Sequence, residues 1–152
     1  MTKARQDPAA SDLERRREAP SLEDTLGRKI PFAQHLGIRL REKGGGRAVF
    51  ELELRPELMN SFNAAHGGVV MTLLDISMAI AARTMDAEAV GAITVEMKTS
   101  FISVGKGTLI AEGKCVHHGT SVSFCESEAR DTSGRTIARA TGTFMLRKER
   151  KG

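Results

Sequence analysis

The chain of 152 residues contains no tryptophan and no tyrosine, and only six phenylalanines. Proteins that bind single-stranded nucleic acid stack bases on such side chains, and no helix-turn-helix or RRM-like pattern is present. The net charge is a modest +4. The sequence therefore indicates no nucleic-acid partner.

Cysteine is also scarce, with two copies, which is not typical of a secreted disulfide scaffold. No apolar run approaches the ~18 residues that cross a membrane. The polar first 20 residues lack the apolar region of a signal peptide. We therefore expect a cytoplasmic protein without a membrane partner.

The composition, 40% hydrophobic and 28% charged, is typical of one globular domain. Residues 1–20 mix charge, alanine and proline without periodicity, so we expect a disordered leader. The domain itself is predicted over 21–147, followed by a basic tail over 148–152. The positive charge at this end has two interpretations, a solvated tail or attraction of an anionic ligand.

Helix and strand signals alternate along the domain. Ser21 is placed to cap a short helix, and a helical segment over 31–36 ends at Gly37. Strands are predicted over 38–43, 48–54, 92–104, 108–117, 121–130 and 136–146. In 92–104, simple alternation puts Thr94 on the same face as Glu96 and Lys98, opposite the apolar residues.

The longest element is a predicted helix from Gly67 to about Arg83. Between Gly67 and Ala82 its only charged side chain is Asp75. A helix that is apolar nearly all round is normally buried, and a carboxylate inside it is costly unless it is paired or used. Asp75 is therefore a candidate functional residue.

The order of elements is two strands, one long helix and four strands in a meander. Sequential hairpins give an antiparallel sheet, and one apolar helix must bury its surface against that sheet. The predicted fold is α+β, a hotdog fold with the sheet wrapped around the helix.

A further pattern combines the sequence His66-Gly67-Gly68 with Asn60, six residues before the histidine, and Asp75, nine residues after it. This pattern resembles the hotdog thioesterases of the PaaI and acyl-CoA thioesterase 13 type, and the resemblance extends over roughly residues 31–147. The resemblance implies hydrolysis of an acyl-CoA thioester by a homodimer or homotetramer. It also implies no separate cofactor, because coenzyme A is part of the substrate.

The residues suit this chemistry. Gly67 and Gly68 open a helix, where free N–H groups and the helix dipole can hold a developing oxyanion. Asp75 can activate water as a general base or attack as a nucleophile. The structural alternatives are close helix packing at the glycines and an ion pair of Asp75 with Lys98 or Arg139.

The spacing has a further consequence. Gly67 and Asp75 are eight residues apart, roughly 12 Å along a helix at ~1.5 Å per residue. One water molecule cannot contact both within one chain. We therefore expect a site shared by two chains, and the resemblance implies the same arrangement.

Three more residues are candidates for the reaction. By resemblance, Asn60 helps to bind the carbonyl or thiolate end, although a loop asparagine also serves turns. His66 either assists the leaving sulfur or caps the helix. Thr94 corresponds to a Ser or Thr that orients the water in relatives, and its alternative is an ordinary strand threonine.

A turn near the end of the predicted fourth strand is the expected substrate-binding segment. It resembles the segment that contacts the pantetheine and phosphates of coenzyme A, with Thr120 where relatives often have a basic residue. The segment comprises His117, His118, Gly119, Thr120, Ser121 and Val122. Adjacent histidines point to opposite faces of a strand, and no third ligand has metal-site spacing, so no metal site is predicted. Cys115 and Cys125 flank the turn and are expected to face each other as reduced thiols.

Two other functions remain open within this fold. One is an acyl-CoA sensor that binds without hydrolysis, and the other is an enoyl-CoA hydratase or dehydratase. The short leader argues against an attached DNA-binding domain. Hydratases use a histidine and an acidic residue at a different spacing.

Overall fold

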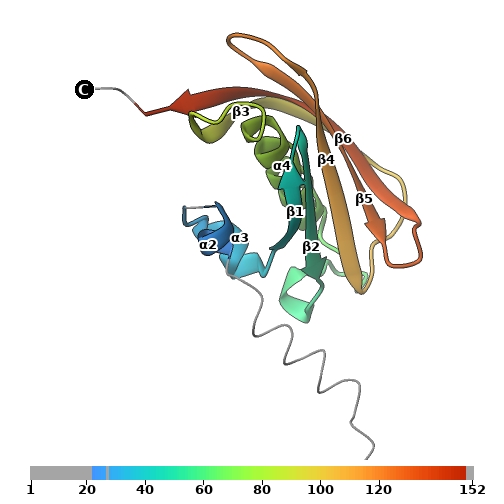
Figure 1. Ribbon diagram of the computed structural model, residues 1–152. Coiled ribbons are helices and arrows are strands. Elements are labelled where there is room, and N and C mark those ends of the chain that lie inside the picture. Colours follow the sequence, from blue (N-terminus) through green and yellow to red (C-terminus); the bar gives the residue numbers. More distant parts are fainter. Residues whose placement is uncertain (1–21, 27, 150–152) are drawn as a thin grey trace, which may run out of the picture.

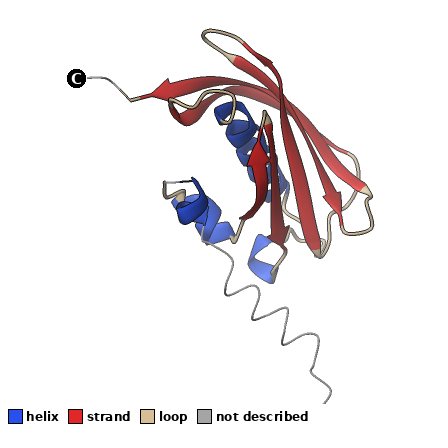
Figure 2. Cartoon of the chain, viewed as in Figure 1, coloured by secondary structure: helices blue, strands red, loops and turns tan. Residues whose placement is uncertain are grey.

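The computed structural model describes residues 22–26 and 28–149. Within these residues, six strands form one antiparallel sheet that curves around a single long helix (Figures 1 and 2). The helices are α2 (Leu22–Leu26), α3 (Pro31–Leu36), the 3-10 turn η1 (Pro56–Leu58) and α4 (Gly67–Arg83). The strands are β1 (Arg39–Gly44), β2 (Arg47–Glu53), β3 (Ala89–Phe101), β4 (Thr108–His118), β5 (Ser123–Asp131) and β6 (Thr136–Lys148).

Helix α4 lies in the hollow of the sheet, and both of its predicted ends are confirmed. Leu73, Leu74 and Met78 are fully buried against Phe50 and Phe144 of the sheet. Burying each such side chain contributes roughly 1.5–3 kcal/mol. The α+β architecture expected from the sequence is thus confirmed.

The centre of α4 comes very close to β4. A Cβ added to Gly113 would lie 2.3 Å from the carbonyl of Ser77. The buried Ser77 hydroxyl donates to the Leu74 carbonyl at 2.7 Å, and it lies 2.7 Å from the Ser127 hydroxyl of β5. These contacts fix the spacing between helix and sheet.

The strand order is β1-β2-β4-β5-β6-β3, which corrects the predicted four-strand meander. Of the last four strands, only β4, β5 and β6 are neighbours in chain order, while β3 pairs with β6 and forms an edge of the sheet. The reason is that β2 occupies the other side of β4 over seven residue pairs. The connection after β3 therefore crosses over, where the Ile102 N–H donates to the Ile137 carbonyl at 2.8 Å.

A second correction concerns β3 itself, whose alternation is interrupted. The register against β6 shifts between Thr94 and Glu96, so Val95 is the extra residue of a β-bulge. Thr94 pairs with the buried Phe144, whereas Glu96 pairs with Thr143. The bulge turns Thr94 to the inner face, away from the face of Glu96.

The termini of the domain also differ slightly from expectation. β6 continues to Lys148, whose ammonium pairs with Asp86 at 2.8 Å, so the first residue of the expected tail belongs to a strand. The predicted leader and the Ser21 cap lie outside the described residues. Gly37 ends α3 in the left-handed region, at φ 79°, as predicted. Among the described helices, none is both long and apolar enough to cross a bilayer.

Candidate active site

The loop before α4 is organised by Asn60. Its Oδ1 accepts hydrogen bonds from the N–H groups of Phe62 and Ala64, at 2.9 and 3.2 Å. The side chain therefore performs the turn role considered from sequence. Because Oδ1 is occupied, the Nδ2 amide is the part of Asn60 left to donate to a ligand.

His66 is the N-cap of α4, as one of its two predicted roles required. Its Nδ1 accepts the Gly68 N–H at 3.1 Å. In a neutral imidazole with an accepting Nδ1, the proton resides on Nε2. The exposed ring thus caps the helix with one nitrogen and can present a donor on the other.

Gly67 supplies the free donor at this helix end. In the described part of the chain, no acceptor takes its N–H, while that of Gly68 is used by His66. The Phe101 ring lies beside Gly67, 3.4 Å from where a Cβ would be. Sequence reasoning missed Phe101, because nothing in a strand pattern shows that its last residue meets a helix N-terminus.

Asp75 lies halfway along α4, on the stripe that the sheet does not cover. Its neighbours on this stripe, Met71 and Ala79, are also not fully buried. Asp75 Oδ1 accepts a 2.7 Å hydrogen bond from the Thr94 hydroxyl. Thr94 can make this contact because the bulge at Val95 turns it inward.

The electrostatics of Asp75 follow from this setting. Burial raises the pKa of its carboxyl above the ordinary value, and the hydrogen bond from Thr94 opposes the rise. Asp75 forms no ion pair with Lys98 or Arg139, the two basic partners considered from the sequence. Arg139 pairs with Glu128 instead. A half-buried carboxylate held by one neutral hydroxyl is a suitable general base or nucleophile.

The predicted substrate-binding turn lies at the other end of α4. The hydrogen bond from Lys148 first, and the nearby His118 ring last, lower the pKa of Asp86, which lies just beyond that helix end. The His118 Nδ1 lies 2.8 Å from the Ser123 hydroxyl. His117 instead packs on the exposed Phe124, with ring centroids 6.1 Å apart. The two histidines thus face opposite sides of β4, as predicted.

The turn after the histidines is closed by a backbone hydrogen bond. The Gly119 N–H donates to the Val122 carbonyl at 2.9 Å, which leaves Thr120 and Ser121 at the exposed tip.

Within one chain the candidate residues therefore form three separate groups. Asn60, His66, Gly67 and Gly68 surround the start of α4, Asp75 and Thr94 meet at its middle, and the 117–122 turn lies near its far end. The helix spans about 25 Å at ~1.5 Å per residue. One thioester group and its attacking water cannot touch all three groups of one chain at once.

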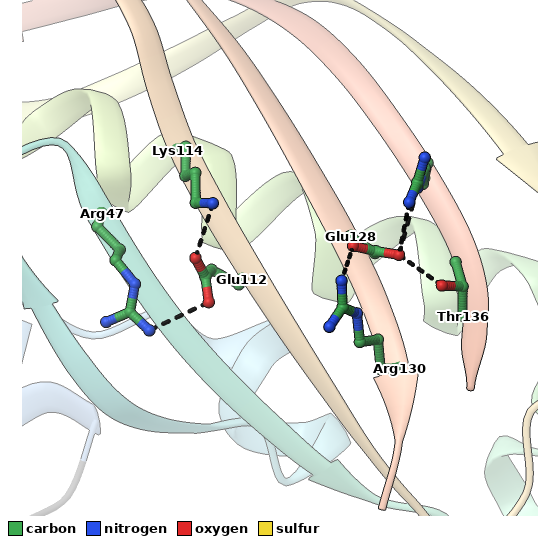
Figure 3. A network of polar contacts seen from close by, with 7 residues as sticks. Arg47, Glu112, Lys114, Glu128, Arg130 and Thr136 are labelled. Atoms are coloured by element: carbon green, nitrogen blue, oxygen red, sulfur yellow. Dashed lines mark hydrogen bonds and ion pairs between the residues drawn. The ribbon is translucent and has the colours of Figure 1, made fainter. Parts of the chain in front are cut away.

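The outer face of the sheet is a different kind of surface. Figure 3 shows Glu112 between Arg47 and Lys114, and Glu128 joined to Arg130 and Thr136. Arg130 and Thr136 are the main causes that lower the pKa of Glu128 to about 2. An open depression of about 800 Å³ lies on this face, away from Asp75. Its charges are largely satisfied by one another, so we do not place the active site there.

No cluster of three or more His, Cys, Asp or Glu side chains with metal-binding geometry occurs among the residues that the structure describes. Cys115 and Cys125 are free thiols and lie opposite each other on β4 and β5, which confirms their predicted facing arrangement.

Comparison with known proteins identifies the family. Residues 62–138, about half of the chain, match the thioesterase superfamily. The chain therefore belongs to this superfamily, and its fold is the hotdog fold. The matched segment includes α4, its glycine-rich start and Asp75.

Individual relatives agree with this assignment. A protein of Saccharolobus solfataricus named "Putative esterase SSO2140" is 28% identical over 127 residues, which are 83% of this chain and 90% of that protein. The Escherichia coli PaaI protein of the phenylacetic acid degradation operon superposes with a TM-score of 0.72 at 20% identity, covering 91% and 93% of the two chains. The protein smu.793 of Streptococcus mutans, solved with acetyl-CoA bound, superposes with a TM-score of 0.67 at 24% identity, covering 75% and 91%.

Proposed function

We propose that this protein is a thioesterase that hydrolyses an acyl-CoA thioester to the free acid and coenzyme A. The observation that carries the proposal is Asp75, a half-buried carboxylate in an otherwise apolar helix, held by Thr94 at 2.7 Å. Membership of the thioesterase superfamily supports the reaction class. The bound acetyl-CoA of the Streptococcus mutans neighbour supports the substrate class.

In the proposed reaction, the Gly67 N–H polarises the thioester carbonyl and holds the oxyanion that forms. A well-placed donor of this kind contributes on the order of 3 kcal/mol. Asp75 removes a proton from the attacking water, or attacks directly to give an anhydride that water then hydrolyses. In this proposal, the Asn60 amide and the His66 Nε2–H donate to the carbonyl or to the leaving sulfur.

The proposed site is formed by two chains. Gly67 and Asp75 are roughly 12 Å apart along one helix, so the Asp75 of one copy must serve the Gly67 of another. The turn comprising 117–122 would then bind the coenzyme A part. The reaction as proposed needs only water in addition to the substrate.

The edge strand β3 supports such an assembly. Ile93, Val95 and Phe101 are 48%, 54% and 55% exposed along an edge of 13 residues. A long apolar edge is an aggregation hazard unless another strand covers it. We propose that a second copy pairs there to give a homodimer, with a tetramer of two dimers as the larger form.

Thiol release from a panel of acyl-CoA substrates tests the activity, and the panel should include phenylacetyl, hydroxybenzoyl and medium-chain acyl groups. Asp75→Asn should lose about 100-fold or more in kcat, as expected for removal of a general base, while it still binds an acyl-CoA. Binding without thiol release by the unaltered protein would favour the sensor. A change in enoyl-thioester absorbance would indicate hydration.

Complementation between variants tests the shared site. Gly67→Pro removes the proposed oxyanion donor, and proline suits the first helical position because His66 is already extended, at ψ 135°. Gly67→Ala adds a Cβ but keeps the N–H, so this control should lose less activity. Mixed dimers of Gly67→Pro and Asp75→Asn should regain part of the activity, because one of their two sites is intact. No recovery after demonstrated subunit exchange would contradict a shared site.

A further inference from the structure

The two cysteines of the chain lie directly opposite each other on neighbouring strands. Cys115 of β4 and Cys125 of β5 are partners in the antiparallel register. Cys125 is buried and Cys115 is half-buried. The pair lies directly beside the 117–122 turn, and neither cysteine belongs to the three groups of candidate active-site residues.

The backbone defines what kind of pair this is. The Cys115 N–H donates to the Gly46 carbonyl at 2.7 Å, in the turn between β1 and β2. The hydrogen-bonding groups of Cys115 thus face away from β5, which makes Cys115 and Cys125 a non-hydrogen-bonded pair. In such pairs the Cα atoms are about 4.5 Å apart and the side chains approach most closely. This separation falls within the ~4.4–6.8 Å that a disulfide spans.

The two thiols are neighbours that differ in accessibility. Burial first, and then the nearby Cys115 thiol, raise the pKa of Cys125 to about 12. The Cys115 sulfur also contacts the His117 carbonyl at 3.5 Å. Cys115 is therefore the thiol that a small reagent reaches first. Cys125 is the buried thiol that can react with it afterwards.

We propose that Cys115 and Cys125 form a reversible dithiol–disulfide site that a hydroperoxide, such as hydrogen peroxide, oxidises. The Cys115 sulfur attacks one peroxide oxygen, the O–O bond breaks, and one water leaves with the thiol proton. The Cys125 sulfur then attacks the sulfenic sulfur, the S–O bond breaks, and the hydroxide leaves as the second water with the proton of the Cys125 thiol. Two thiols lose two electrons, and the peroxide gains them.

The place of this bond in the fold gives it a consequence. The register of β4 against β5 shifts immediately after Cys115, so the ladder is interrupted between the cysteines and the turn 119–122. A covalent link at this point would hold the two strands together next to the interruption in their backbone pairing. The proposal does not depend on thioesterase activity, so the two can fail independently.

The test uses the full-length protein, reduced and then treated with hydrogen peroxide at neutral pH, denatured and alkylated with N-ethylmaleimide. Both cysteines lie on one tryptic peptide, residues 115–130, between Lys114 and Arg130. We expect that peptide to be unalkylated and lighter by two hydrogen atoms. Dithiothreitol should restore alkylation of both cysteines. The protein should remain uncrosslinked between chains on a non-reducing gel.

Two variants test the order of events. In Cys125→Ala, Cys115 should stop at the sulfenic acid and react with dimedone. In Cys115→Ser, Cys125 should resist both peroxide and alkylation in the folded protein. Two alkylated cysteines after peroxide treatment, a link between chains, or over-oxidation of Cys115 beside a free Cys125 would each overturn the proposal. The measurement on the unaltered protein decides the matter even if a variant fails to fold.

Discussion

At the scale of single residues, the partly buried carboxylate of Asp75 is costly to ionise, and the proposed reaction uses its ionised form. Burial of its carboxylate works against ionisation, while the hydroxyl of Thr94 works for it. The balance between these two effects determines the pH range in which a base is available. Both effects can be changed one at a time.

Thr94→Val tests the hydrogen bond. Because the Thr94 hydroxyl lowers the pKa of Asp75, its loss should raise that pKa further. The acid limb of the kcat/KM profile should then move to higher pH. Thr99→Val is the matched control, since the buried Thr99 hydroxyl has no hydrogen-bond partner among the described residues. An unchanged limb in Thr94→Val would contradict the contact.

Asp75→Asn should also change stability, with a sign that depends on pH. A raised pKa means that the folded protein holds the proton more tightly than the unfolded chain. The resulting stabilisation is present below the ordinary pKa of aspartate and is lost as the pH rises through the raised value. Asparagine should therefore stabilise the fold at neutral pH, with a benefit that disappears in acid, as measured by urea unfolding.

Asp131→Asn is a control for which the expected change in stability has the opposite sign. Hydrogen bonds, first from Ser133 and then from the Arg135 backbone, lower the pKa of Asp131. Its contribution is therefore present at neutral pH and lost as the pH falls through the lowered value. This variant should be less stable at neutral pH, and equal signs for the two variants would contradict the assignment.

At the scale of elements, the distance between α4 and the sheet is set by the absence of a side chain. At Gly113 the helix backbone occupies the space that a Cβ would fill, with the Met78 nitrogen at 2.6 Å from it. Backbone atoms cannot rotate away as side chains do. The helix can therefore keep its position only with glycine there.

Gly113→Ala should destabilise the protein by about 3 kcal/mol or more, at the upper end of overpacking effects. Gly91→Ala in β3 is the control, because nothing lies within 4 Å of its added Cβ. That control should change the free energy of unfolding by less than about 0.5 kcal/mol. Equal effects in chemical denaturation would show that the close approach is not what matters.

The helices and strands differ in how much of their structure the sequence predicts. The ends of α4 were predictable because His66-Gly67-Gly68 and the loss of apolar residues after Ala82 mark them locally. The pairing of β3 with β6 was not, since alternation reveals the faces of a strand but not its neighbours. The contact of Thr94 with Asp75 depends on a bulge, and an extra residue in one strand leaves no mark in composition.

At the scale of the whole molecule, the uncovered side of α4 and the edge of β3 expose apolar side chains within one chain. Phe62, near the helix start, is 83% exposed. Met71 and Asp75 lie on the uncovered stripe of α4. A second copy in the proposed dimer would cover such surfaces and complete the site at the same time.

Val95→Glu should therefore give a monomer with at least about tenfold lower activity, because a charge on the edge opposes strand pairing. Sedimentation velocity measures the assembly, and circular dichroism checks the fold. Val116→Glu is the control for assembly, since Val116 is a comparably exposed valine on the inner strand β4. A dimer that survives Val95→Glu with full activity would rule out pairing at this edge.

The bulge at Val95 makes the inward position of Thr94 depend on one residue staying out of the ladder. The pairs of Thr94 with Phe144 and of Glu96 with Thr143 skip Val95, so its deletion would leave a regular strand in which Thr94 still faces the helix. A slip that takes Val95 into the ladder would instead rotate the stretch before it by half a turn, so that Thr94 would face solvent. In a designed library, the register on either side of Val95 should therefore be held constant, whereas the extra residue can be kept or removed without turning Thr94 away from the catalytic arrangement that we propose.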